Sequence, residues 1–225
     1  MATPIFRWRH LTLLISLLVI MIATPILAPL RHGILLINII GVVVLLAASY
    51  AISDRKHFFT MAVILSIASL IGNWLLVMYP SHTLVILAHS CVIALLSFFA
   101  ITTLSYAVGS GRVTADRIFA AICAYLLIGY AWAFGYALLD ELEPGAFAAV
   151  TDLGRSNYIN RVIEMRYFSF ITLTTVGYGD IVPRSSGART MAMLEAIVGQ
   201  FYLVALVGRL VGLHIVHESN PAERG

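Results

Sequence analysis

Six apolar stretches alternate with short polar separators along the chain. They lie near residues 11–30, 33–53, 58–79, 82–108, 118–139 and 188–216. As a helix, each is long enough to cross about 30 Å of hydrocarbon. Arg7 and Arg9 precede the first stretch, so a signal peptide is the alternative there, but the run is long and no small-residue cleavage site follows it. The pattern predicts an all-α membrane protein with six transmembrane helices.

Composition supports a membrane protein and excludes several other classes. Hydrophobic residues make up 60% of the chain and charged residues only 11%, against roughly 25% charged in soluble domains. The mean hydropathy is +0.95. Cys91 and Cys123 both lie in apolar runs and do not suggest a disulfide framework. The net charge of +3 is spread between the runs, so nucleic-acid binding has no support. The sequence has no nucleotide-binding fingerprint and no metal-ligand cluster, and we expect neither a cofactor nor enzyme activity.

The segment between the fifth and sixth stretches, residues 140–187, differs from the other separators. Residues 163–174 read as a short helix of about 18 Å, enough for half a bilayer. Thr175, Val176, Gly177, Tyr178 and Gly179 follow it directly. When four chains meet, their backbone carbonyls can replace the water around a dehydrated cation. The two glycines permit the positive φ angles that aim consecutive carbonyls inward. The segment therefore predicts a re-entrant pore helix and an ion-coordinating loop.

These residues resemble a known family. The run from Tyr167 to Ser169 and the run from Thr172 to Asp180 are similar to the pore signature of the tetrameric potassium channel superfamily. The resemblance covers roughly residues 118–216. It implies an outer helix, a pore helix, a selectivity filter and an inner helix in a four-fold symmetric homotetramer, with K⁺ as the permeant ion.

The resemblance also implies residue roles. Ion-binding positions would be Thr175, Val176, Gly177, Tyr178 and Gly179, with K⁺ itself at Thr175, Val176, Gly177 and Tyr178. Thr174 and Asp180 would support the filter. Gly199 stands where the family bends its inner helix, and it is either that hinge or a close-packing glycine. Ile171 replaces an acidic residue found in some family members, so the inactivation associated with that residue is not expected.

The first four helices, within residues 1–117, resemble a voltage-sensor layout without its charges. In voltage-gated channels the fourth helix carries repeated arginines. Residues 82–108 contain no Arg or Lys. The sequence therefore predicts weak or no voltage gating.

The polar residues inside the apolar stretches include Asn38, Asn73, His89 and Glu195. For the first three, hydrogen bonds between helices are the expected role. Glu195 is expected to have a structural role, either pairing with Arg166 or Arg189 or forming hydrogen bonds behind the filter.

Basic residues in short loops predict the orientation. With both termini in the cytoplasm, the inner segments hold Arg7, Arg9, Arg55, Lys56, Arg112, Arg117 and Arg224, whereas the two short outer loops hold only Arg31. The expected location is therefore the cell membrane, in contact with lipid, with residues 140–187 outside and a short cytoplasmic tail at 217–225. Alternatives to a potassium channel are a nonselective cation channel, a subunit of a potassium uptake system and a non-conducting regulatory membrane protein.

Overall fold

The structure is a computed structural model, and it describes residues 8–52, 56–79, 81–109, 114–149 and 158–218. The elements are α1 (Arg9–Leu27), α2 (Gly33–Ala51), α3 (Lys56–Met78), α4 (His82–Ala107), α5 (Ala115–Leu142), β1 (Phe147–Ala149), α6 (Tyr158–Leu173), β2 (Ile181–Pro183) and α7 (Ser186–Glu218). Helices α1 to α5 and the Ser186–Leu206 part of α7 are long and apolar enough to cross a membrane. This confirms the predicted all-α architecture with six spans.

Several helix boundaries differ from the prediction, and α6 begins at Tyr158 instead of residue 163. Helix α5 begins at Ala115 instead of residue 118, because the Thr114 side chain accepts a hydrogen bond from the Arg117 N–H and Asp116 follows in the first turn. Both features stabilise a helix N-terminus. Helix α7 continues to Glu218, so it includes the first residues of the predicted tail.

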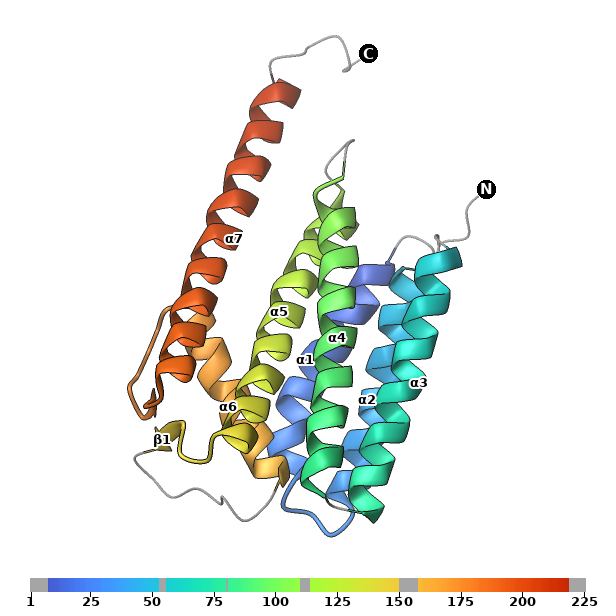
Figure 1. Cartoon of the computed structure of the whole chain (residues 1–225). Helices are drawn as coiled ribbons and strands as arrows, with labels where there is room; N and C mark the ends of the chain where they lie inside the picture. The colour runs from blue at the N-terminus through green and yellow to red at the C-terminus, as the bar shows by residue number, and fades with distance from the viewer. Residues whose placement is uncertain (1–7, 53–55, 80, 110–113, 150–157, 219–225) are drawn as a thin grey trace.

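The helices form a bundle with one outlying member. Figure 1 shows α1 to α5 side by side, with α7 separated from α1 to α3 and leaning against α6. Helices α1 and α4 both pack on α5 of the same chain, while α2 packs on α1 and α3 packs on α4. The core between α1, α4 and α5 includes Leu13, Leu17, Leu95, Phe99 and Leu127, all nearly fully buried.

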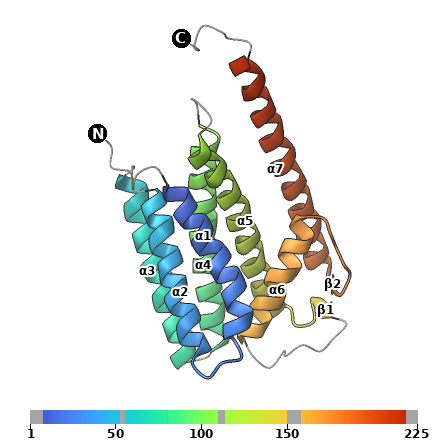
Figure 2. The same ribbon diagram turned by 180° about the vertical axis from the view of Figure 1, so that it is seen from behind.

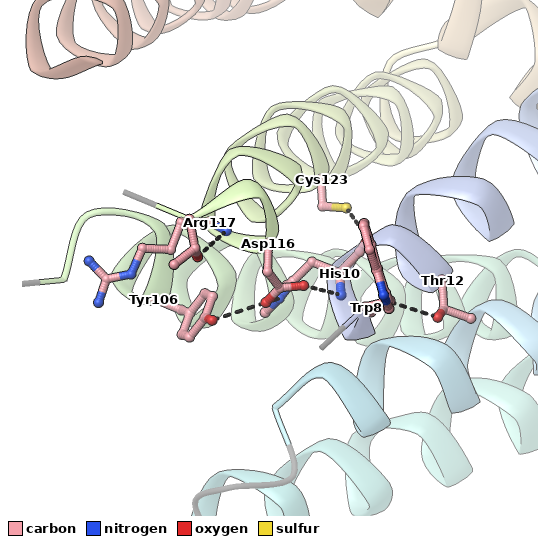
Figure 3. Close-up of polar contacts among 8 residues, drawn as sticks. Trp8, His10, Thr12, Tyr106, Asp116, Arg117 and Cys123 are labelled. Carbon is pink, nitrogen blue, oxygen red and sulfur yellow. Dashed lines mark hydrogen bonds and ion pairs between the residues drawn. The ribbon is translucent and has the colours of Figure 1, made fainter. Parts of the chain in front are cut away.

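The N-terminal end of α1 is fixed to α4 and α5 by a polar cluster (Figure 3). Asp116 accepts hydrogen bonds from the His10 N–H (3.1 Å) and the Tyr106 hydroxyl (3.0 Å), and its Oδ2 lies 2.7 Å from His10 Nδ1. The His10 and Tyr106 rings stack with centroids 4.5 Å apart. Because the three residues stand near the ends of three different helices, the cluster ties these helices together at one point.

Other intramembrane polar residues also have partners. Asn73 Nδ2 donates to Asn38 Oδ1 at 2.7 Å, which confirms the predicted bond between α2 and α3. His89 Nδ1 donates to the Val85 carbonyl of its own helix at 2.8 Å, and its ring meets Phe134 of α5 edge-on. Arg209 of α7 donates to the Val108 and Gly109 carbonyls at the C-terminal end of α4. A cation is favourable at a helix C-terminus, so this contact joins α7 to α4.

A short antiparallel ribbon of β1 and β2 was not predicted from the sequence. Phe147, Ala148 and Ala149 pair with Pro183, Val182 and Ile181. The ribbon joins the end of α5 to the segment that follows the TVGYG loop. Phe147 and Ile181 also pack with Tyr136, Met165 and Phe168 in a second buried cluster behind that loop.

Candidate functional site

The candidate site is built on α6, a helix of 16 residues and so about 24 Å, too short to cross a bilayer. Helix α6 is terminated at its C-terminal end by a Schellman motif. The Thr175 N–H donates to the Thr172 carbonyl at 2.9 Å, and the Val176 N–H reaches back to the Ile171 carbonyl at 2.8 Å. This pattern requires a left-handed residue just after the helix, and Thr175 supplies it with φ +58°.

Beyond the turn, left-handed residues alternate. Thr175, Gly177 and Gly179 have φ of +58°, +51° and +80°. The positive φ expected at the two glycines is confirmed. The sequence did not predict it at Thr175, where a non-glycine residue in this region costs of order 1 to 3 kcal/mol. Such strain persists only when its surroundings hold it, and here the Schellman turn does so.

The loop is exposed within a single chain. The side chains of Val176 and Tyr178 are 51% and 72% exposed. Thr174 donates its hydroxyl to the Phe170 carbonyl one turn back at 2.6 Å, so it reinforces the end of α6. Gln200 of α7 donates its side-chain amide to Thr175 Oγ1 at 3.2 Å. Sequence reasoning missed Gln200, because its partner lies on another element.

Asp180 holds the far end of the loop. Its carboxylate accepts the Tyr167 hydroxyl of α6 at 2.6 Å and the Ile181 N–H at 3.0 Å. The loop is therefore fastened to α6 at both ends, by the helix cap before it and by the Tyr167–Asp180 bond after it.

Glu195 lies fully buried between three helices of the site. Its Oε2 accepts the Tyr136 hydroxyl of α5 at 2.6 Å, and its Oε1 lies 2.5 Å from Ser169 Oγ of α6. Ser169 Oγ is also 2.7 Å from the Gly129 carbonyl. Ser169 has one hydroxyl hydrogen, so both contacts are hydrogen bonds only when the Glu195 carboxyl carries a proton and donates it to Ser169.

The two arginines that were considered as partners of Glu195 bind elsewhere. Arg166 donates to the Met21 carbonyl of α1, and Arg189 donates to the Pro183 carbonyl. The ion-pair alternatives for Glu195 were therefore wrong, and the hydrogen-bonded alternative is confirmed.

Gly199 brings α7 against the end of the pore helix. A Cβ built on Gly199 would lie 2.1 Å from the Leu173 carbonyl oxygen, so only a glycine permits this approach. The Tyr125 hydroxyl donates to the same carbonyl at 3.2 Å. Within the described residues, no group of three or more His, Cys, Asp or Glu side chains could hold a metal ion.

Comparison with known proteins identifies this part of the chain. A protein family described as "Ion channel" matches residues 138–213, from the end of α5 to α7. Two pore potassium channel a of Oryza sativa subsp. japonica is 35% identical over 77 residues, covering 34% of this chain and 21% of that protein. TWiK family of potassium channels protein 7 of Caenorhabditis elegans is 33% identical over 102 residues, covering 45% and 15%. Residues 138–213 are therefore similar to a family of ion channels, and the two relatives are both potassium channels.

The chain is also similar to Protein LctB of Bacillus caldotenax, with 28% identity over 100 residues, covering 44% of this chain and 74% of that protein. The chain spans about a fifth or less of the length of the plant and nematode channels. These similarities confirm the predicted resemblance to the potassium channel superfamily, and they indicate a channel segment and not an enzyme. Helices α1 to α4 lie outside the family match.

The buried carboxyl gives a stability prediction. Glu195→Ala leaves the buried Tyr136 hydroxyl without its acceptor and opens a cavity, so we expect a loss of about 3 kcal/mol or more. Glu195→Gln keeps an acceptor for Tyr136 and a donor for Ser169, and we expect it to retain wild-type stability. Thermal unfolding in detergent, followed by size-exclusion chromatography, measures both. Glu143→Ala, which removes an exposed carboxylate, is the control. Equal damage from Gln and Ala would contradict the protonated arrangement.

Proposed function

We propose that four copies of this chain form a potassium-selective channel whose filter is the loop of residues 175–179. The observation that carries the proposal is the alternation of left-handed residues at Thr175, Gly177 and Gly179 directly after the pore helix. Such alternation turns successive carbonyls toward one side of the strand, which is what a column of cation sites requires. The channel relatives named for potassium support the choice of ion.

In this mechanism the protein replaces the ion's water. Carbonyls of Thr175, Val176, Gly177 and Tyr178 from four chains coordinate K⁺, and the Thr175 hydroxyl contributes a further oxygen at the inner end. Gln200 donates to that hydroxyl oxygen and so fixes its direction. Thr174 and Asp180 support the loop from its two ends. The C-terminal end of α6 adds a partly negative charge near the path. K⁺ is the only ion required, and no cofactor takes part.

Two features of the single chain support a tetramer: its one TVGYG loop and the exposed apolar side chains of α7. Each chain has one TVGYG loop and provides one side of the ring. A row of large apolar side chains on α7 is exposed in the single chain: Met193, Leu194, Ile197, Phe201 and Val204. Inside a membrane, such side chains can pack against neighbouring copies of the chain or against lipid.

The proposed placement is the cell membrane with both termini in the cytoplasm. Helix α1 begins and α7 ends on the same side of the structure, opposite the ribbon of β1 and β2 (Figure 1). Among the short connecting segments, those assigned to the side of the termini carry more basic residues than the two on the opposite side, as expected for the inner face. We divide the chain into a four-helix domain (1–117), a pore domain (118–216) and a tail (217–225).

The four-helix domain does not carry a charge sensor in its fourth helix. Helix α4 contains no Arg or Lys along its 26 residues. Because steep voltage dependence needs several charges per subunit to cross the field, the proposal includes conduction with little dependence on voltage.

The test is current through the purified protein in planar lipid bilayers under opposed K⁺ and Na⁺ gradients. The reversal potential should follow the K⁺ gradient, and the conductance should vary little with voltage. A reversal potential near zero under these opposed gradients would instead identify a nonselective cation channel. A steep conductance–voltage curve would contradict the absence of voltage gating. No current at any voltage or pH would favour a regulatory membrane protein.

A further inference from the structure

Helix α1 contains a proline inside its span, and this leaves one backbone acceptor free of its usual helical donor. Pro25 has no N–H, so it cannot donate to the carbonyl four residues earlier, which belongs to Met21. In a membrane no water replaces the missing donor, and an unsatisfied carbonyl is costly there. A donor from outside α1 is therefore needed.

Arg166 of the pore helix supplies that donor. Its Nη2 donates to the Met21 carbonyl at 3.3 Å, and its side chain is only 9% exposed. The guanidinium carbon lies 6.0 Å from the centre of the Tyr130 ring, a distance at which a cation is attracted to the ring. Tyr130 itself donates to the Leu17 carbonyl, one turn before Met21, at 3.2 Å. Two side chains of the pore domain thus hold consecutive turns of α1.

Tyr167, the next residue of the pore helix, contacts the end of the filter. Tyr167 donates to Asp180, the residue that follows the TVGYG loop. Arg166 therefore faces α1, while its neighbour holds the end of the filter. Residues of both contacts, among them Met21, Arg166 and Asp180, line one groove of about 550 Å³. Figure 2 shows α1 and α6 converging at their outer ends.

We propose that Arg166 is a positioning residue that docks the pore helix on the proline-vacated carbonyl of α1, so that α1 sets the position of the filter. The proposal rests on the proposed filter function. The N-terminal end of α1 is fixed to the first turn of α5 through His10 and Asp116, so α1 is held by α6 on one side and by the start of α5 on the other. This gives the first helix a role in conduction although it carries no part of the ion path.

The test compares Arg166→Met with the double variant Pro25→Ala/Arg166→Met. In the single variant the Met21 carbonyl loses its donor, and we expect lower stability, about tenfold faster amide hydrogen exchange in residues 174–181, and a similar loss of K⁺ current. In the double variant the alanine that replaces Pro25 has a backbone N–H, which donates to the Met21 carbonyl within α1. Stability should recover, but exchange protection and current should not, because α1 no longer contacts the pore helix.

Three comparisons complete the experiment. Arg166→Lys keeps a charge and a donor, so it should retain part of the current and of the exchange protection. Arg31→Met, which alters an exposed arginine of the turn between α1 and α2, should behave as wild type. Recovery of exchange protection and current in the double variant would overturn the proposal, because Arg166 would then only satisfy a carbonyl. Hydrogen exchange tests the positioning role of Arg166 even if the wild-type protein carries no current. An absence of wild-type current would count against the filter function and not against this role.

Discussion

Gly177→Ala is expected to abolish K⁺ current while the protein still folds and assembles. Gly177 has φ +51°, a conformation that costs an alanine about 1 kcal/mol. The chain can avoid this conformational cost if the peptide group next to residue 177 rotates. That rotation turns a backbone carbonyl away from the ion path. Four copies meet in one pore, so the intact ring becomes less favourable by about 4 kcal/mol, or roughly a thousandfold. Current in planar bilayers measures the effect.

The matched control is Gly145→Ala. Gly145 also has a left-handed φ, +91°, and a Cβ there would meet nothing within 4 Å, as at Gly177. It lies in the turn after α5 and is not part of residues 175–179. The two substitutions therefore carry a similar backbone cost, and only the first should remove current. If both variants conduct like the wild type, residues 175–179 do not form the filter.

The sequence could predict the spans and the loop because both are local patterns. Each transmembrane helix follows from about twenty consecutive apolar residues, and only their ends moved in the structure, as at Ala115. The positive φ at Gly177 and Gly179 follows from residue type. The resemblance implied that Asp180 supports the filter, and this role stays a prediction; the bond from Tyr167 to Asp180 was not predicted.

What the sequence could not predict depends on side chains that are distant along the chain. Glu195 joins Tyr136 and Ser169, which lie 59 and 26 residues away, and nothing local distinguishes these partners from two nearby arginines. Arg166 binds a carbonyl 145 residues earlier. A proline in an apolar run does signal that some carbonyl needs a donor, but not which residue provides it. Only the packing of α1 on α6 decides that.

Gly199→Ala decides between the two roles considered for this glycine, because they predict stability changes of opposite sign. If Gly199 serves only as a hinge, alanine stabilises α7 by up to about 1 kcal/mol and alters gating alone. The structure favours the other outcome. The added methyl group would lie 2.1 Å from the Leu173 oxygen and 3.0 Å from its carbon, both backbone atoms that cannot rotate away.

Relief of this clash requires α7 to move away from the end of the pore helix. Overpacking of this kind typically costs about 1 to 3 kcal/mol, and we expect at least that loss in thermal unfolding of the detergent-solubilised protein. Gly41→Ala is the matched control, since Gly41 is also helical and a Cβ there would meet nothing within 4 Å. It should be neutral or slightly stabilising. If Gly199→Ala also stabilises the protein, close packing against Leu173 is not what requires a glycine at this position, and the hinge role is favoured.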